Sequence, residues 1–202
     1  MINNYTEFEK LIEEYKSNGI RKKLLLHSCC GPCSSYVIDF LKDYFDLTIY
    51  YFNPNIDPLE EYEKRLENQF KIRDALDKNI PIIKGKYDPS LFLEKVKGYE
   101  EDKEGGHRCD LCIELRLEET AKKTKELNFD YFTTTLSISP FKNSNHINEI
   151  GFKLADKYQI DFLYSNFKKK DGYKKSIILS NKYDLYRQVY CGCIYSCKIK
   201  NN

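Results

Sequence analysis

Short runs of apolar residues alternate with stretches of helical spacing along this chain, and the alternation predicts its elements. Apolar side chains that recur every third or fourth residue are typical of helices, whereas short continuous runs are typical of buried strands. The runs predict strands over residues 22–27, 47–52, 80–83, 130–135 and 161–164. Helical spacing predicts helices over residues 6–17, 34–44, 58–78, 89–97, 108–127, 145–158 and 176–180. This order predicts an α/β fold, a five-stranded parallel sheet with helices on both faces.

The length of the chain suits one domain. Its 202 residues are 41% hydrophobic, enough to bury a substantial core. We expect a single α/β domain over 1–202, with a helical N-terminal extension at 1–20 and an irregular, cysteine-containing C-terminal segment at 186–202. No apolar stretch approaches the ~18 residues of a membrane span, and no signal-peptide pattern is present. We therefore expect a cytoplasmic protein with no membrane partner.

The net charge of +2 argues against a polycation but leaves room for a local basic face. One lysine-rich run, framed by two aromatic residues, contains Lys168, Lys169, Lys170, Lys174 and Lys175. The ordinary explanation of such a run is a solvated loop. The sharper hypothesis is a phosphate-binding patch with stacking rings for single-stranded RNA.

The 8 cysteines fall mostly into three tight clusters, and this clustering narrows the function more than any other feature. The clusters are Cys29, Cys30 and Cys33; Cys109 and Cys112; and Cys191 and Cys193, with Cys197 close behind. The first lies on a predicted strand-to-helix turn and the second in the first turn of a helix. In parallel sheets, ligands bind at the carboxyl ends of the strands, where these two clusters can meet.

Clustered thiolates indicate metal ligation, redox exchange or both. Cys29, Cys30, Cys109 and Cys112 supply four thiolates, which suit tetrahedral zinc or an iron–sulfur cluster, and their spacing does not choose between the two. The string from Cys30 to Cys33 also spells the dithiol motif of thioredoxin-like oxidoreductases. A plain dithiol enzyme, however, would give no role to the other cysteines.

The last cluster differs because a single residue separates its two sulfurs. A disulfide between Cys191 and Cys193 would close a small, strained ring, and strained disulfides are easily reduced. A redox pair is therefore one interpretation, and it favours iron–sulfur chemistry over zinc at the other clusters. Two further metal ligands, or a tail without a role, are the alternatives. Among the remaining polar residues, Asp110 and His107 are candidate proton donors near any bound metal.

Several separated strings, in order, resemble the QueH family of epoxyqueuosine reductases. They are LLLHSCCGPC at 24–33, YFNPNI at 51–56, RCDLCIELRL at 108–117, TTTL at 133–136 with SPFK at 139–142, and YRQVYCGCIYS at 186–196. The resemblance covers most of the chain. It implies a Rossmann-like fold of the HUP/PP-loop kind, and an enzyme that reduces epoxyqueuosine to queuosine at the wobble position of tRNA.

The same resemblance implies roles for the cysteines and some basic residues. A [4Fe–4S] cluster would be bound by Cys29, Cys30, Cys109 and Cys112. A redox-active disulfide would join Cys191 and Cys193, and Cys33 would face a possible second mononuclear metal ion, iron or zinc. The partners would be a tRNA carrying epoxyqueuosine and an unidentified electron donor. Beside the lysine-rich run, Lys142 and Arg187 are our weaker candidates for binding the phosphates. The alternatives are a thioredoxin-like thiol oxidoreductase and a zinc-stapled RNA-binding module.

Overall fold

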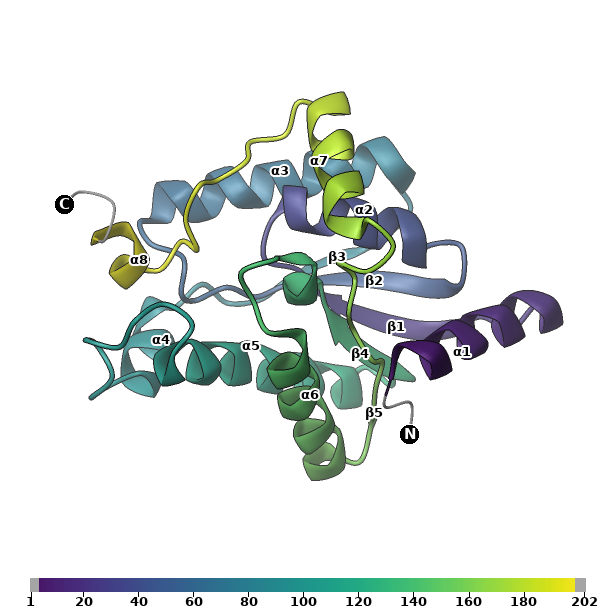
Figure 1. Ribbon diagram of the computed structural model, residues 1–202, viewed down its shortest axis with the longest axis horizontal. Helices are drawn as coiled ribbons and strands as arrows, with labels where there is room; N and C mark the ends of the chain where they lie inside the picture. Colours follow the sequence, from purple (N-terminus) through teal and green to yellow (C-terminus); the bar gives the residue numbers. More distant parts are fainter. Residues whose placement is uncertain (1–3, 199–202) are drawn as a thin grey trace.

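The centre of the molecule is a sheet of five parallel strands, in the order β3-β2-β1-β4-β5 (Figure 1). The computed structural model describes the backbone of residues 4–198 and the side chains of residues 4–196. The strands are β1 (Lys22–His27), β2 (Phe45–Tyr51), β3 (Ile82–Lys84), β4 (Tyr131–Thr134) and β5 (Asp161–Phe162). Each neighbouring pair runs parallel. The predicted α/β fold with a five-stranded parallel sheet is confirmed.

Helices cover both faces of this sheet, as the sequence pattern predicts. Figure 1 shows α2, α3 and α7 on one side and α5 and α6 on the other. The helices are α1 (Tyr5–Asn18), α2 (Gly31–Leu41), α3 (Leu59–Asp77), α4 (Pro89–Lys95), α5 (His107–Glu126), α6 (Ser144–Tyr158), α7 (Gly172–Lys182) and α8 (Ile194–Lys198). A 3-10 helix, η1 (Thr135–Ile138), follows β4. Within the described residues, none of these helices has the length and apolar character needed to cross a bilayer.

The central strand β1 divides the core into two parts. Leu24 and Leu26 pack in the main apolar cluster together with residues of α1 and α2. Leu25 points to the opposite face, where it packs with Tyr50 and Phe52. Side chains alternate across a strand, so a continuous apolar run here means burial on both faces.

The N-terminal helix is built into the main core. The side-chain amide oxygen of Asn4 accepts a hydrogen bond from the Glu7 N–H and caps α1, and Gly19 ends the helix with a left-handed φ of 64°. Phe8, Ile12 and Tyr15 are buried in the same cluster as the central strand. The segment that we expected as an extension therefore contributes apolar surface to the domain itself.

Several elements have other bounds than the sequence pattern predicts; for example, α2 begins at Gly31 and not at residue 34, and β5 ends at Phe162 and not at residue 164. Strand β3 begins at Ile82 and not at Ile80, whose side chain is buried in the core. Pro81 between them has no N–H, so it takes part only through its carbonyl oxygen, which accepts a hydrogen bond from Ile49 N–H. The predicted helix at 176–180 is the centre of a longer one, since α7 begins at Gly172. In the described part of the C-terminal segment, residues 194–198 form the short helix α8 and residues 186–193 are irregular.

Candidate functional site

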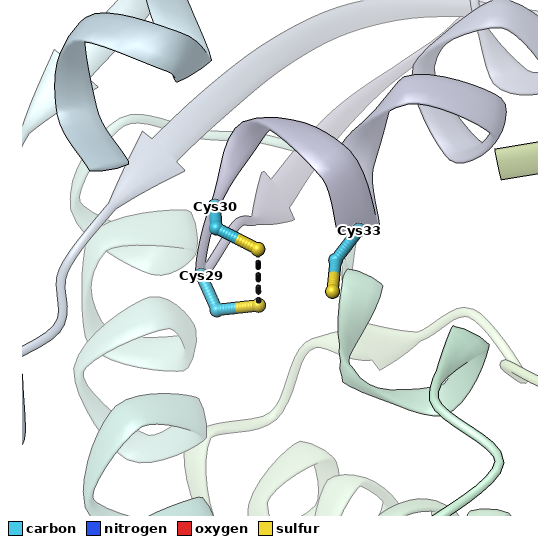
Figure 2. A group of neighbouring side chains, drawn as sticks. All are labelled: Cys29, Cys30 and Cys33. Atoms are coloured by element: carbon cyan, nitrogen blue, oxygen red, sulfur yellow. Dashed lines mark hydrogen bonds between the residues drawn. The ribbon is translucent and has the colours of Figure 1, made fainter. Parts of the chain in front are cut away.

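The first cysteine cluster sits at the carboxyl end of β1, where the chain turns into α2. The sulfurs of Cys29, Cys30 and Cys33 all lie within 4.8 Å of one another, close enough to hold a single metal ion. Figure 2 shows Cys29 and Cys30 side by side, with Cys33 facing the same space from the first turn of α2. Gly31 makes this turn possible, because a Cβ there would lie 2.4 Å from the backbone oxygen of Asn68 on α3.

The three thiols share hydrogen bonds that concentrate negative charge on one sulfur. Hydrogen bonds from Cys30 and then Cys33 hold the pKa of Cys29 well below its ordinary value. The same interaction with Cys29 raises the pKa of Cys30 to about 12 and that of Cys33 well above its ordinary value. Of the three thiols, Cys29 is therefore the one that loses its proton most readily.

A second group of cysteines lines one cavity beside α5. Cys109 and Cys112, from the first turn of that helix, line it together with Cys191 and Cys193 from the C-terminal segment. Burial raises the pKa of Cys112 to about 11 and also raises that of Cys109. Among the described residues, the group within reach of a single ion contains only the three cysteines near β1, so Cys109 and Cys112 lie outside it.

Two cations, Arg116 and Lys142, link these two groups. Both line the cavity of the second group. The guanidinium of Arg116 interacts electrostatically with Cys29 as well as with Cys112. It is 3% exposed, and its Nε donates to the Cys112 carbonyl oxygen over 3.1 Å. The amine of Lys142 lies 3.6 Å from Cys191 Sγ, and the charge of Cys191 is the main cause that raises the pKa of Lys142.

In the described part of the chain, neither cation has a carboxylate within 4.0 Å. Burying a positive charge without an opposite one is costly. The cavity is therefore suited to negative charge, which ionised cysteines or an anionic group bound by them would supply.

The C-terminal segment reaches both groups. Gln188 Nε2 donates to Cys30 Sγ over 2.8 Å, and Cys193 is buried against Cys112 and Phe92. Cys191 and Cys193 are both free thiols. The side chain of Cys197, to which we gave no role, lies outside the described residues.

The two candidate proton donors have different surroundings. Asp110 Oδ1 lies 3.8 Å from His146 Nδ1, so it faces a histidine of the first turn of α6. The ring of His107 packs edge-on against Tyr99, with centroids 4.6 Å apart. The contact of Asp110 with His146 is electrostatic and longer than a hydrogen bond, whereas His107 is held by an aromatic contact.

The predicted phosphate-binding residues divide into two sets. Lys142 points its amine into the cysteine cavity, and Lys168 donates to the Lys142 carbonyl oxygen over 2.7 Å. The others gather around α1, α2 and α7: Lys169 lies over Tyr5, Lys170 pairs with Glu9, Lys175 lies over Tyr36, Arg187 lies over Tyr173, and Lys174 is exposed on α7. The exposed basic surface is therefore mainly the second set.

Sequence reasoning missed Arg116, Arg65, His146 and Gln188. Arg116 carried a usable signal, since it follows Cys112 by one helical turn and so shares its face of α5. The other three carry none, because the cysteines that Arg65 and Gln188 contact, and the aspartate beside His146, are distant in sequence. Only the fold shows these contacts.

Comparison of the sequence with known proteins identifies a family and several similar proteins. Residues 24–199 match the model of a family described as epoxyqueuosine reductase QueH. A protein named epoxyqueuosine reductase QueH from Streptococcus pyogenes is 38% identical, over 98% of this chain and 80% of its own. One of the same name from Staphylococcus epidermidis is 42% identical, over 96% and 84%.

A solved structure gives a more distant match in fold. It is the U34-tRNA thiolase NcsA from Methanococcus maripaludis with its [4Fe-4S] cluster. Its TM-score is 0.55 at 14% identity, covering 95% of this chain and 68% of that one. At this identity, the likeness shows a shared α/β fold.

Proposed function

The chain belongs to the QueH family of epoxyqueuosine reductases, and we propose that it reduces epoxyqueuosine to queuosine at the wobble position of tRNA, using a [4Fe–4S] cluster. Family membership makes it an oxidoreductase of queuosine biosynthesis. The observation that carries the cluster is the pair of cations, Arg116 and Lys142, set among cysteines from three separate segments without a carboxylate partner in the described chain.

The residues present fit such a cluster. Cys29, Cys30, Cys109 and Cys112 are the proposed ligands, and thiolates are the usual ligands of iron–sulfur clusters. A cluster is larger than a single ion, so its ligands need not lie within one ion's reach of one another. When bound, it supplies electrons one at a time at the carboxyl end of the sheet. Cys33 is the proposed ligand of a second mononuclear iron or zinc ion.

Cys191 and Cys193 are the proposed redox-active pair. Converting the epoxide to an alkene consumes two electrons and two protons and releases one water. Oxidation of a dithiol to a disulfide releases the same number of electrons and protons, so the two half-reactions balance. An electron donor of unidentified nature then returns the disulfide to the dithiol.

The remaining polar residues bind the substrate and move a proton. The epoxide oxygen must be protonated as its carbon–oxygen bonds break, and Asp110, with His146 beside it, is the better placed of the candidate acids. The tRNA backbone would contact the lysines around α7. An anticodon loop presents its base unpaired, so the enzyme avoids the cost of opening a duplex.

A zinc-stapled RNA-binding module is the second candidate, favoured by the three sulfurs within 4.8 Å at the end of β1. Anaerobic purification separates the two proposals. We expect brown protein with iron, sulfide and an absorption band near roughly 400 nm, and conversion of epoxyqueuosine in tRNA by nucleoside analysis. Changing Cys109 to Ser should remove both, while T124S, a control on the same helix, should leave both unchanged. Colourless protein with one zinc per chain and no conversion would support the second candidate instead.

A further inference from the structure

The segment that ends in the Cys191-Gly192-Cys193 turn packs against one face of α3. Lys64 lies over the ring of Tyr186, at 3.6 Å from its centroid, and Asn68 Oδ1 accepts from Tyr186 N–H over 2.8 Å. Arg65, between them on the same face, reaches the turn itself. We propose that Arg65 is a positioning residue that holds this turn against the cysteine site.

All three nitrogens of the Arg65 guanidinium donate hydrogen bonds, two of them to the turn. Its Nη1 donates to the Cys191 carbonyl oxygen over 2.9 Å, and its Nη2 donates to the Tyr190 carbonyl oxygen over 3.3 Å. Its Nε donates to Glu61 Oε1 over 2.6 Å. A lysine has one compact ammonium and cannot reproduce this planar arrangement.

The backbone of Gly192 packs closely against this guanidinium. Its φ of +104° is a backbone conformation that side chains disfavour, and a Cβ there would lie 2.6 Å from Arg65 Nη1. The carbonyl oxygen of Gly192 accepts from Asp57 N–H over 2.9 Å. The turn is thus fixed from two sides, and only glycine fits at its centre.

This anchoring decides where Cys191 lies. With the turn docked, Cys191 Sγ is 3.6 Å from the Lys142 amine, while Gln188 of the same segment contacts Cys30. Arg65 touches neither sulfur of the Cys191–Cys193 pair. It forms an ion pair with Glu61, whose side chain is 10% exposed, and its charge also interacts with the thiols of Cys30 and Cys29. Its contacts with the turn are hydrogen bonds to backbone oxygens, so the labelling of Cys191 tests a geometric role. Its relevance to turnover rests on the proposed function of the Cys191–Cys193 pair.

The experiment compares the full-length, anaerobically reduced protein with R65Q, R65K and the control R73Q. Arg73 lies on the same helix but bonds to Asp74 and the Ile80 carbonyl, away from the turn. Iodoacetamide labelling of Cys191 is followed by peptide mass spectrometry. Loss of charged hydrogen bonds should raise the labelling rate about 10- to 100-fold in R65Q. R65K should fall between R65Q and the wild type, and R73Q should match the wild type.

Steady-state kinetics give the second readout. R65Q should lower kcat with KM for tRNA unchanged, because the turn and not the RNA surface is released. If R65Q fails to fold, G192A tests the same contact by changing the turn instead of the arginine. Cys191 should then be labelled faster in G192A than in the wild type. Equal labelling of Cys191 in wild type, R65Q and G192A would overturn the proposal. If Cys191 is labelled faster in R65Q but the wild-type protein has no reductase activity, the anchoring role of Arg65 is supported and the proposed function is rejected.

Discussion

The Nζ atom of Lys142 lies 3.6 Å from the Sγ atom of Cys191. This contact places a positive charge directly beside the proposed redox pair. The Lys142 amine faces the cavity of the second cysteine group, which Lys142, a half-buried residue, lines. Lys142, which we named as a weaker candidate for phosphate binding, thus lies beside a cysteine sulfur, and its role in binding phosphate stays a prediction.

Replacing Lys142 by Met should impair chemistry and spare binding. We expect kcat to fall about tenfold or more, since removing one group that stabilises developing charge in an active site costs on the order of 100-fold in kcat. The affinity for tRNA and its dependence on salt should not change. Stopped-flow turnover and binding titrations at several salt concentrations measure the two effects. A weaker, less salt-dependent affinity in K142M would return Lys142 to the RNA surface.

Replacing Lys174 and Lys175 by Gln should have the opposite result. These lysines belong to the exposed basic surface around α7, where their loss releases fewer counterions on RNA binding. The slope of log affinity against log salt should become shallower by about 1.5, with kcat unchanged. K153Q, on the exposed face of α6, is the matched control. An unchanged slope would mean that RNA binds elsewhere.

Replacing Arg116 by Met should make the iron–sulfur centre harder to reduce. Reduction adds negative charge, which the buried guanidinium stabilises, so its loss should move the reduction potential to more negative values. A shift on the order of 60 mV corresponds to a tenfold change for a one-electron couple. Redox titration of the purified protein measures it, and R116K should restore most of the potential. No shift in R116M would show that this charge serves folding alone.

Replacing Gly31 by Ala should disturb the turn that gathers the first three cysteines. The new Cβ would press on the backbone of Asn68, which cannot move like a flexible side chain. We expect the free energy of unfolding to fall by about 1–3 kcal/mol, the usual cost of overpacking, together with loss of iron. Gly19 offers a control, because a Cβ there meets nothing within 4 Å. G19A should cost stability through its left-handed φ and keep its iron, as urea denaturation and iron analysis can show.

Much of the fold could be predicted from the sequence because local patterns encode it. The apolar run of Leu24, Leu25 and Leu26 predicts a strand buried on both faces, and the spacing of the cysteines indicates a site. The contacts among the site residues could not be predicted, because they join positions that only the folded chain brings together. Arg65 bonds to Cys191 across 126 residues, and nothing in the spacing of α3 indicates that contact. Lys142 was assigned to phosphate because a lysine in a loop looks the same in sequence whether its amine faces water or a sulfur.

The hydrogen bond between Gln188 and Cys30 spans 158 residues of chain. A ribosome must therefore synthesise nearly the whole described polypeptide before the first cysteines meet their last neighbours. Any metal centre at Cys29 and Cys30 would gain its contact with the C-terminal segment only then.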